Sequence, residues 1–143
     1  MTADGIRYSE TREIDLDQIV RLYHENAWSS ARKPVQLRDA LIHSHTLISA
    51  WEAEALVGIG NAISDGHLVV YYPHLIVRPS YQRMGIGREI LERLSAKYSG
   101  FHQQMLVADL QAVDFYQRNG FRRAGETVAM WIYDGEDHSR ESE

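Results

Sequence analysis

The sequence has no cysteine, only three prolines and no long apolar run. Without cysteine the chain has no disulfide, no thiolate nucleophile and no cysteine ligand for a metal. Its histidines lack the spacing of metal ligands, so we predict no metal site. A membrane helix needs about 18 consecutive apolar residues, so we expect no membrane association. These absences suit a reducing cytoplasm, which we predict as the location.

Linkers, repeats and low-complexity tracts are also lacking, and residues 1–10 have neither the basic start nor the apolar stretch of a secretory signal. The length of 143 residues suits one domain, and a hydrophobic fraction of 44% is enough for a sizeable core. We predict a single domain over residues 1–134 and a polar, disordered tail over 135–143. The net charge of −5 disfavours nucleic-acid binding and favours a cationic acceptor such as an amine.

Apolar periodicity predicts an α+β order of elements. Helices are expected to begin near Asp15, after Pro34, near Ile86 and at Leu110, the third ending at Gly100. The predicted strands are rich in β-branched and apolar residues and cover 6–8, 46–51, 55–63, 67–77, 104–108, 121–124 and 128–133. The strands from 46 to 77 form an antiparallel meander, in which Pro73 should cause a bulge or a splayed edge.

The segment that points to chemistry joins a strand to a helix through a loop containing Gly85 and Gly87. Glycine lets the backbone approach a ligand closely, and the first turn of a helix presents unpaired N–H groups and a positive dipole end. Arg83 and Arg88 add positive charge, and Arg78 lies just before the loop. The combination predicts a cradle for a diphosphate.

Other kinds of phosphate loop fit less well. A P-loop requires lysine and then Ser or Thr after its last glycine, but Arg88 and Glu89 stand there. A dinucleotide fingerprint requires three glycines in a parallel unit with an acidic residue further on, and only two glycines are present. An ordinary glycine-containing turn before a helix remains open for the loop taken alone.

Two blocks resemble the GNAT superfamily of N-acetyltransferases. The run Gln82-x-x-Gly85-x-Gly87, after Leu75-Ile76-Val77-Arg78-Pro79, is similar to the acetyl-CoA signature of that family. The block from Ala108-Asp109 through Asp114-Phe115-Tyr116 to Gly120-Phe121 is similar to its next conserved segment. Within the superfamily both blocks look closest to the arylalkylamine and serotonin acetyltransferase-like branch.

The resemblance implies a three-layer fold, with a mixed, mostly antiparallel sheet of six to seven strands. It implies helices on both faces and a V-shaped splay between two parallel strands. The implied activity is transfer of an acetyl group from acetyl-CoA to a primary amine, on a small molecule or a peptide, by direct attack in a ternary complex. A module that senses acetyl-CoA without turnover is the alternative. A partner-binding scaffold has no support, since no exposed apolar stripe or basic tract is predicted. Many relatives pair as dimers, so the resemblance allows a homodimer for this chain as well.

The resemblance also implies which residues bind acetyl-CoA. Backbone groups of a short strand would hold the pantetheine arm and the thioester carbonyl, and this strand consists of Leu75, Ile76 and Val77. The following loop would hold the pyrophosphate and consists of Gln82, Arg83, Met84, Gly85, Ile86, Gly87 and Arg88. Asp109 stands where many relatives carry an asparagine that contacts the cofactor.

Tyr116 matches the catalytic tyrosine of the family. A phenol with a pKa near 10 can donate a proton to a developing thiolate as general acid, although an isolated tyrosine here would also suit a helical core. His74 is the first candidate for the base that accepts the proton of the alkylammonium, and Glu52 the second. A solvated strand histidine is an equally compatible interpretation of His74. Tyr71 occupies the position where histone-acetylating relatives carry a glutamate base.

The acceptor pocket is expected between the first two helices and the strand around Tyr71 and Tyr72. Trp28, Trp51 and Trp131 are candidate aromatic walls, although each would also suit the core.

Overall fold

The computed structural model describes residues 5–138. Its strands are β1 (Ile6–Ser9), β2 (Thr46–Glu52), β3 (Ala55–Ser64), β4 (Val69–Tyr71), β5 (Leu75–Val77) and β6 (Gln103–Met105). Within the described residues they form a six-stranded sheet in the order β1-β2-β3-β4-β6, and β5 also pairs with β3. The pairing of β4 with β6 is parallel, and the other pairs are antiparallel. The prediction of a mixed, mostly antiparallel sheet is confirmed.

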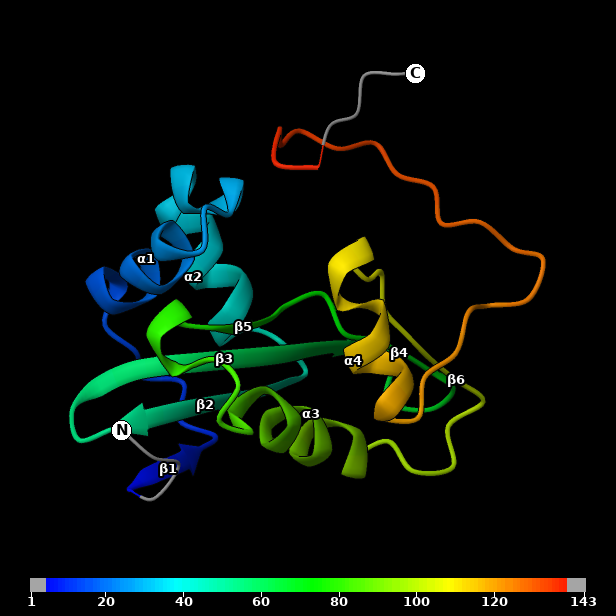
Figure 1. Ribbon diagram of the computed structural model, residues 1–143, viewed down its shortest axis with the longest axis horizontal. Helices are drawn as coiled ribbons and strands as arrows, with labels where there is room; N and C mark the ends of the chain where they lie inside the picture. Colours follow the sequence, from blue (N-terminus) through cyan, green and yellow to red (C-terminus); the bar gives the residue numbers. More distant parts are fainter. Residues whose placement is uncertain (1–4, 139–143) are drawn as a thin grey trace.

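Helices cover both faces of the sheet (Figure 1). They are α1 (Leu16–Glu25), α2 (Pro34–Ile42), α3 (Ile86–Ala96) and α4 (Val113–Arg118), with the short 3-10 helices η1 (Ser29–Arg32), η2 (Pro79–Tyr81) and η3 (Leu110–Ala112). Leu22 of α1 shares one core with Ile59 of β3, and Ile90 of α3 shares the other with Val57 of β3. Regular alternation would place Val57 and Ile59 on one face, but the register of β2 and β3 shifts at Val57, and this bulge turns Val57 to the other core. None of these helices within residues 5–138 is long and apolar enough to cross a membrane.

The close packing of α3 on β3 depends on two glycines that the sequence analysis did not single out. A Cβ on Gly60 would lie 2.6 Å from Ile90 Cγ2 and 3.0 Å from Leu94 Cδ1. A Cβ on Gly58 would lie 3.2 Å from Ile90 Cδ1. The helix fits only because the strand has no side chain at these positions. The two glycines therefore set how close α3, and with it the loop at its start, comes to the sheet.

The predicted strand over residues 67–77 is wrong at its centre, because it forms as two strands. β4 runs parallel to β6 until Tyr72 N donates to Met105 O at 3.0 Å. The nitrogen of Pro73 faces β3 and has no N–H to donate. The register with β3 shifts by one residue between the pairs Tyr71–Ile63 and Leu75–Gly60, and β5 pairs on one side only, with β3. The chain beyond β6 therefore separates from β5, which confirms the predicted V-shaped splay and places its vertex at Pro73.

The predicted strands at 121–124 and 128–133 are also wrong. Residues 121–138 leave the end of α4, arc outside β6 and return above α1 and α2 (Figure 1). Val128, Met130 and Ile132 are 81%, 90% and 105% exposed, so this segment carries an exposed apolar stripe that the sequence analysis did not predict. Residues of high β-propensity form a strand only where a neighbouring strand offers free N–H and C=O groups for pairing.

The tail that was predicted to begin at Gly135 lies partly within the described residues. Lys33 Nζ donates to Asp134 Oδ2 at 2.5 Å, and Ser29 N donates to Asp137 Oδ2 at 3.1 Å. Residues 134–137 therefore lie against η1, and residues 139–143 fall outside the described part of the chain.

Candidate functional site

One edge of β5 faces the splay with free backbone groups. Arg78 N donates to a β3 carbonyl at 2.8 Å, and Ile76 stands opposite Ile59 of β3. In an antiparallel pair the backbone groups of alternate residues point to opposite sides. Leu75 and Val77 therefore direct their N–H groups into the splay, whereas Ile76 bonds toward β3. Two of the three residues predicted to hold the pantetheine arm thus have the free backbone groups that such a contact needs.

The loop between η2 and α3 presents a row of unpaired amides. Among residues 5–138, the N–H groups from Arg83 to Arg88 have no protein acceptor. Arg83 and Gly85 have φ angles of +67° and +85°, and such left-handed residues are typical of backbone turns that bind anions. Ile86, the first residue of α3, is buried in the core, and Met84 is half-buried against it. The first turn of α3 adds the positive end of the helix dipole, so the loop has the donors and the field that a diphosphate requires.

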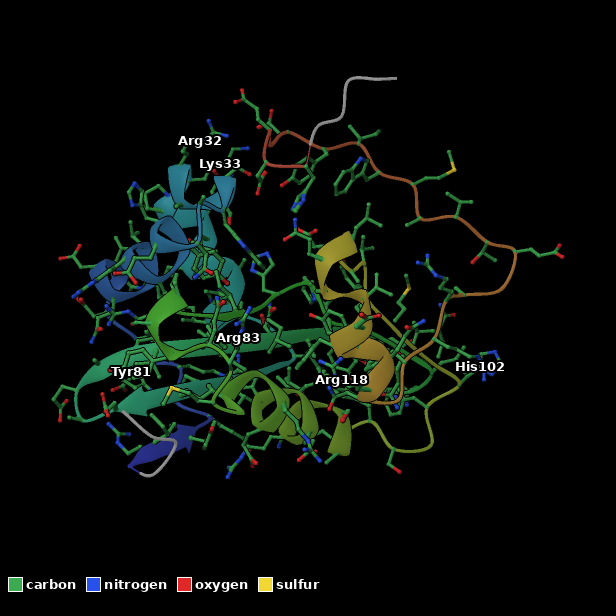
Figure 2. All side chains as sticks on the ribbon, in the orientation of Figure 1. Arg32, Lys33, Tyr81, Arg83, His102 and Arg118 are labelled. Carbon is green, nitrogen blue, oxygen red and sulfur yellow. The ribbon has the colours of Figure 1, made fainter. Side chains whose placement is uncertain are left out.

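The three arginines near the loop differ in their partners. Arg78 donates to both carboxylate oxygens of Glu25, at 2.9 and 3.2 Å. Arg88 donates to Glu92 one turn further along α3, at 3.0 Å. Arg83 is exposed on the loop before α3 (Figure 2) and makes no ion pair with any residue in the described range. The positive charge that remains available to an anion at this loop is therefore that of Arg83.

Gln82 braces the loop through its side chain. Its Nε2 donates to Val77 O at 2.9 Å and to Asn26 Oδ1 at 3.2 Å. Asn26 Nδ2 also donates to Val77 O, at 3.1 Å. These bonds tie the end of β5 to the end of α1 and to the loop. In this arrangement the side-chain amide of Gln82 positions the neighbouring backbone.

His74 lies directly before β5 in an aromatic surrounding. Its ring centroid is 5.2 Å from that of Trp28 in an edge-on arrangement, and its Nδ1 lies 2.8 Å from Tyr23 Oη in a hydrogen bond. Burial lowers the pKa of His74 to about 4 and raises the pKa of Tyr23. Both groups are therefore neutral at pH 7, and His74 at that pH has the protonation state of a base, although a weak one.

The sequence analysis missed two asparagines that hold this region together. Asn61 Oδ1 accepts from His74 N at 3.1 Å, and Asn61 N donates to His74 O at 3.1 Å. Asn61 is 3% exposed, and a lone amide in the apolar run 55–63 is a signal that could have revealed it. Asn26 follows the last turn of α1 at an ordinary helix end, so nothing in its sequence context pointed to its bond with Val77.

We expect the free energy of unfolding to decrease as the pH falls from about 6.5 to about 4. The folded protein keeps His74 neutral with a pKa of about 4, whereas an unfolded histidine takes up a proton below about pH 6.5. Neutral His74 therefore costs no stability above about pH 6.5. Below that pH the free energy of unfolding falls, by up to roughly 3 kcal/mol at about pH 4. Urea unfolding at several pH values measures this slope. The His74→Gln variant should flatten it, and the exposed-site control His102→Gln should not. Equal slopes in His74→Gln and the wild type would contradict the assignment.

Tyr116 lies in α4, and its neighbour Phe115 reaches the glycine loop. A Cβ on Gly87 would lie 3.7 Å from Phe115 Cζ and 3.8 Å from Val77 Cγ2, so α4, β5 and the start of α3 meet at Gly87. The ring of Tyr116 packs against Phe121 with centroids 6.0 Å apart. Burial raises the pKa of Tyr116 to about 12. The phenol therefore keeps its proton at neutral pH, as a general acid must.

The remaining candidates have structural partners. Asp109 caps η3 by accepting a backbone N–H at 3.2 Å. Glu52 accepts the hydroxyl hydrogen of Tyr81. Trp51 is 8% exposed and belongs to the core, so it is not a pocket wall. Within residues 5–138, no group of three or more His, Cys, Asp or Glu residues is placed to hold a metal ion.

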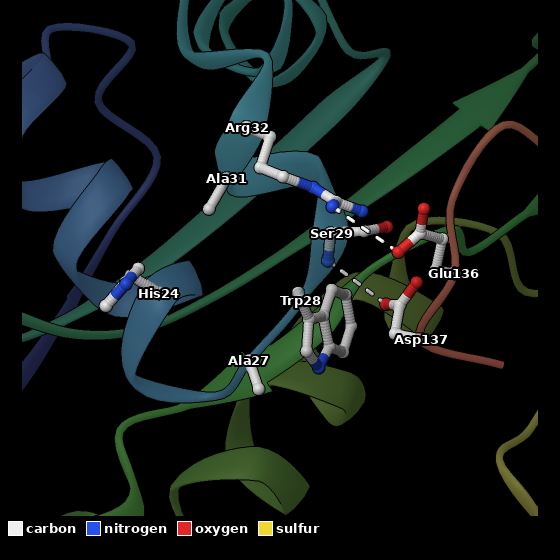
Figure 3. A pocket seen from close by; sticks show the side chains of 8 residues that line it. All are labelled: His24, Ala27, Trp28, Ser29, Ala31, Arg32, Glu136 and Asp137. Atoms are coloured by element: carbon white, nitrogen blue, oxygen red, sulfur yellow. Dashed lines mark hydrogen bonds and ion pairs between the residues drawn. The ribbon is translucent and has the colours of Figure 1, made fainter.

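A hollow of about 530 Å³ lies beside η1 (Figure 3). It is lined by His24, Ala27, Trp28, Ser29, Ala31, Arg32, Glu136 and Asp137. Trp28 connects it to His74 through their ring contact. Neither Tyr71 nor Tyr72 lines this hollow, and the Tyr72 hydroxyl donates to Gln104 Oε1 at 2.6 Å. The hollow therefore lies beside the end of α1 and η1, away from the two tyrosines, and the acceptor pocket expected around them stays a prediction.

The fold and this site define a known class of protein. A family profile described as "Acetyltransferase (GNAT) domain" matches residues 10–131, and the chain belongs to this family of acetyltransferases. A GNAT family acetyltransferase from Streptococcus pneumoniae TIGR4 is 28% identical, with a TM-score of 0.77 over 90% of this chain and 98% of that one. A probable acetyltransferase from meticillin-resistant Staphylococcus aureus shares the fold, with a TM-score of 0.79 at 19% identity over 90% and 99% of the two chains.

Curated relatives agree with the family. A protein named uncharacterized N-acetyltransferase ycf52-like, from Prochlorococcus marinus, is 26% identical over 87% of this chain and 73% of its own length. Histone acetyltransferase TAP1 of Glycine max is 26% identical over 89% of this chain, which spans 60% of that protein. Serotonin N-acetyltransferase 2, chloroplastic, of Oryza sativa subsp. japonica is 32% identical over 63% of this chain and 48% of its own length. The superfamily prediction is confirmed, and the serotonin-like branch stays a prediction.

Proposed function

We propose that this chain transfers the acetyl group of acetyl-CoA to a primary amine by direct attack in a ternary complex. The observation that carries the proposal is the junction at Gly87. There the free edge of β5, the unpaired amides of the loop and the helix that bears Tyr116 come together. The amides from Arg83 to Arg88 suit a diphosphate. The outward N–H groups of Leu75 and Val77 suit the amide-containing pantetheine arm.

In the proposed reaction Tyr116 donates one proton and His74 accepts another. The amine nitrogen attacks the thioester carbonyl carbon, and the carbon–sulfur bond breaks. Tyr116 donates its proton to the departing sulfur, which a phenol that stays protonated at neutral pH is suited to do. His74 accepts the proton that the nitrogen loses. A nitrogen bonded to an acyl carbon is far more acidic than an alkylammonium, so the low pKa of His74 suits a late proton transfer.

A module that binds acetyl-CoA without turnover is the alternative function. Such a sensor needs the amide cradle but has no use for a protonated phenol beside it. The ring of Tyr116 lies 5.1 Å from that of Phe115, which reaches Gly87, and this position favours the enzyme. The acceptor amine is open, but the contact of Trp28 with His74 and the name of the rice relative make an arylalkylamine a good first choice.

Thiol release from acetyl-CoA tests the function. The purified chain would be assayed with an arylalkylamine, an aliphatic diamine and a lysine-containing peptide, and the acetylated product would be identified by mass spectrometry. We expect release above the rate without amine for at least one acceptor. Calorimetric uptake of coenzyme A with no release for any acceptor would support the sensor. No uptake of coenzyme A would overturn both functions.

A further inference from the structure

The chain before β5 meets β3 at Asn61 in an irregular way. Residues 72–74 lie opposite only residues 61 and 62 of β3, because the register shifts between β4 and β5. A regular antiparallel pair of His74 with Asn61 would exchange two backbone bonds. One of them is made, from Asn61 N to His74 O at 3.1 Å. For the other, His74 N donates to the side-chain Oδ1 of Asn61 at 3.1 Å. A side-chain amide therefore takes the place of a backbone carbonyl at the vertex of the splay.

The side chain of Asn61 is held on its other side by hydrogen bonds that lead to α2. Asn61 Nδ2 donates to Ser44 Oγ at 2.9 Å, and Ser44 Oγ donates to Ala40 O at 2.8 Å. Asn61 and Ser44 are both buried, so bulk water does not compete for these bonds. A backbone N–H can only donate, so His74 N requires the oxygen of the amide, and the nitrogen then faces Ser44. The network therefore fixes the one orientation of the amide that satisfies His74 N.

The two bonds of Asn61 also set the direction of the next peptide unit. The C=O of His74 and the N–H of Leu75 belong to one planar unit and point in opposite directions. Because Asn61 N holds His74 O toward β3, the N–H of Leu75 points into the splay. The ring of His74 is held by Tyr23 Oη at 2.8 Å and by the edge contact with Trp28. Asn61 therefore fixes the backbone that carries both the free N–H and the histidine ring.

We propose that Asn61 is a positioning residue for the acetyl transfer. The inference rests on the proposed function, in which the free N–H groups of β5 hold the arm of acetyl-CoA and His74 accepts a proton. Without Oδ1 of Asn61, the N–H of His74 has no acceptor, and the peptide units on either side of it rotate toward another one. A displacement of about 1 Å at a reacting group lowers a rate by about 100-fold. The amides of the loop from Arg83 to Arg88 lie outside this network, so coenzyme A affinity does not depend on Asn61.

The Asn61→Leu variant tests the proposal, because leucine has nearly the shape of asparagine and no polar atom. Its kcat for thiol release should fall by about 10- to 100-fold, whereas its Kd for coenzyme A in isothermal titration should change by less than about threefold. Ser44→Ala is the matched control, since it breaks the same buried network but leaves Oδ1 on His74 N, and its kcat should stay within about threefold of the wild type.

If Asn61→Leu does not fold, Asn61→Ser replaces it, because its shorter side chain ends before the position of Oδ1 and should give the same loss of kcat at unchanged affinity. An unchanged kcat in the variant that folds would overturn the proposal. An equal loss of kcat in Ser44→Ala would overturn it as well, because the loss would then follow the network as a whole.

An NMR titration of the His74 ring separates this proposal from the proposed function, because it needs no turnover. Burial lowers the pKa of His74 to about 4. The groups that face the ring are Tyr23 of α1 and Trp28 before η1, and both are uncharged at pH 7. In Asn61→Leu the loosened ring gains water, so its pKa should rise toward the ordinary value of about 6.5. In Ser44→Ala the pKa should stay at about 4.

The His74→Gln variant identifies the resonance among those of the other histidines. An unchanged pKa in Asn61→Leu would overturn the positioning role of Asn61. A wild type that binds coenzyme A but releases no thiol with any amine would overturn the proposed function alone, and a raised pKa in Asn61→Leu would still assign the placement of His74 to Asn61.

Discussion

Replacing Tyr116 with phenylalanine is expected to lower kcat by about 10²- to 10⁴-fold, the range that one general acid contributes. The departing thiolate would then have to leave without a proton from the enzyme. Because burial raises the pKa of Tyr116 to about 12, the wild-type phenol is protonated at any pH at which the protein would be assayed. Thiol release at saturating acetyl-CoA and amine measures kcat, and calorimetry measures coenzyme A affinity, which should change little.

Tyr8→Phe is a matched control for this experiment. Tyr8 lies on β1, which pairs with β2, and Arg93 of α3 lies 4.6 Å above its ring. The same hydroxyl is removed, and kcat should be unchanged. Full activity in Tyr116→Phe would exclude Tyr116 as the acid. A loss of coenzyme A affinity equal to the loss of kcat would assign it a binding role instead.

Replacing Gly85 with valine is expected to weaken coenzyme A binding by about ten- to a hundredfold. Gly85 has a φ of +85°, and a β-branched residue in that region costs roughly 1–3 kcal/mol. The loop then relaxes to a conformation in which its amides no longer converge, and each 1.4 kcal/mol lost corresponds to about tenfold in Kd. Isothermal titration with coenzyme A measures the change.

Gly100→Val provides the same backbone strain at a distance from the site. Gly100 has a φ of +86°, and, as at Gly85, a Cβ there would have no neighbour within 4 Å. The variant should lose stability to a similar extent and keep its coenzyme A affinity. If both variants weaken binding equally, the effect is a general loss of folding, and the loop is not the diphosphate site.

Most of the elements up to residue 118 could be predicted because their signals are local. The apolar spacing of α1 and α3 and the position of Pro34 at the start of α2 each act within one or two helical turns. Pro73 marked the splay for a similar reason, since a residue without N–H cannot continue a ladder. The prediction failed at residues 121–133, where the apolar alternation is correct but no strand of the same chain lies beside it.

The candidate site also has parts that the sequence revealed and parts that depend on distant contacts. The glycine loop was visible in the sequence because its conformation and its helix start lie within seven residues. The surroundings of His74 were not, because Tyr23 and Trp28 come from α1 and from the residue that precedes η1. The pairing of Arg78 with Glu25, which removes one charge from the predicted basic cluster, was hidden for that reason too.

The amino-acid sequence by itself determined the α+β order of elements, the loop with its free amides and the family to which the chain belongs, because these depend on residues adjacent along the chain. The tertiary structure alone decided which backbone groups of β5 remain free and which arginine stays unpaired within the described residues. It also decided the protonation state of His74 and left the strand-like segment at 127–133 without a partner in its own sheet. Each of those depends on contacts between residues far apart in the chain, where burial and hydrogen bonding act only after the fold has brought them together.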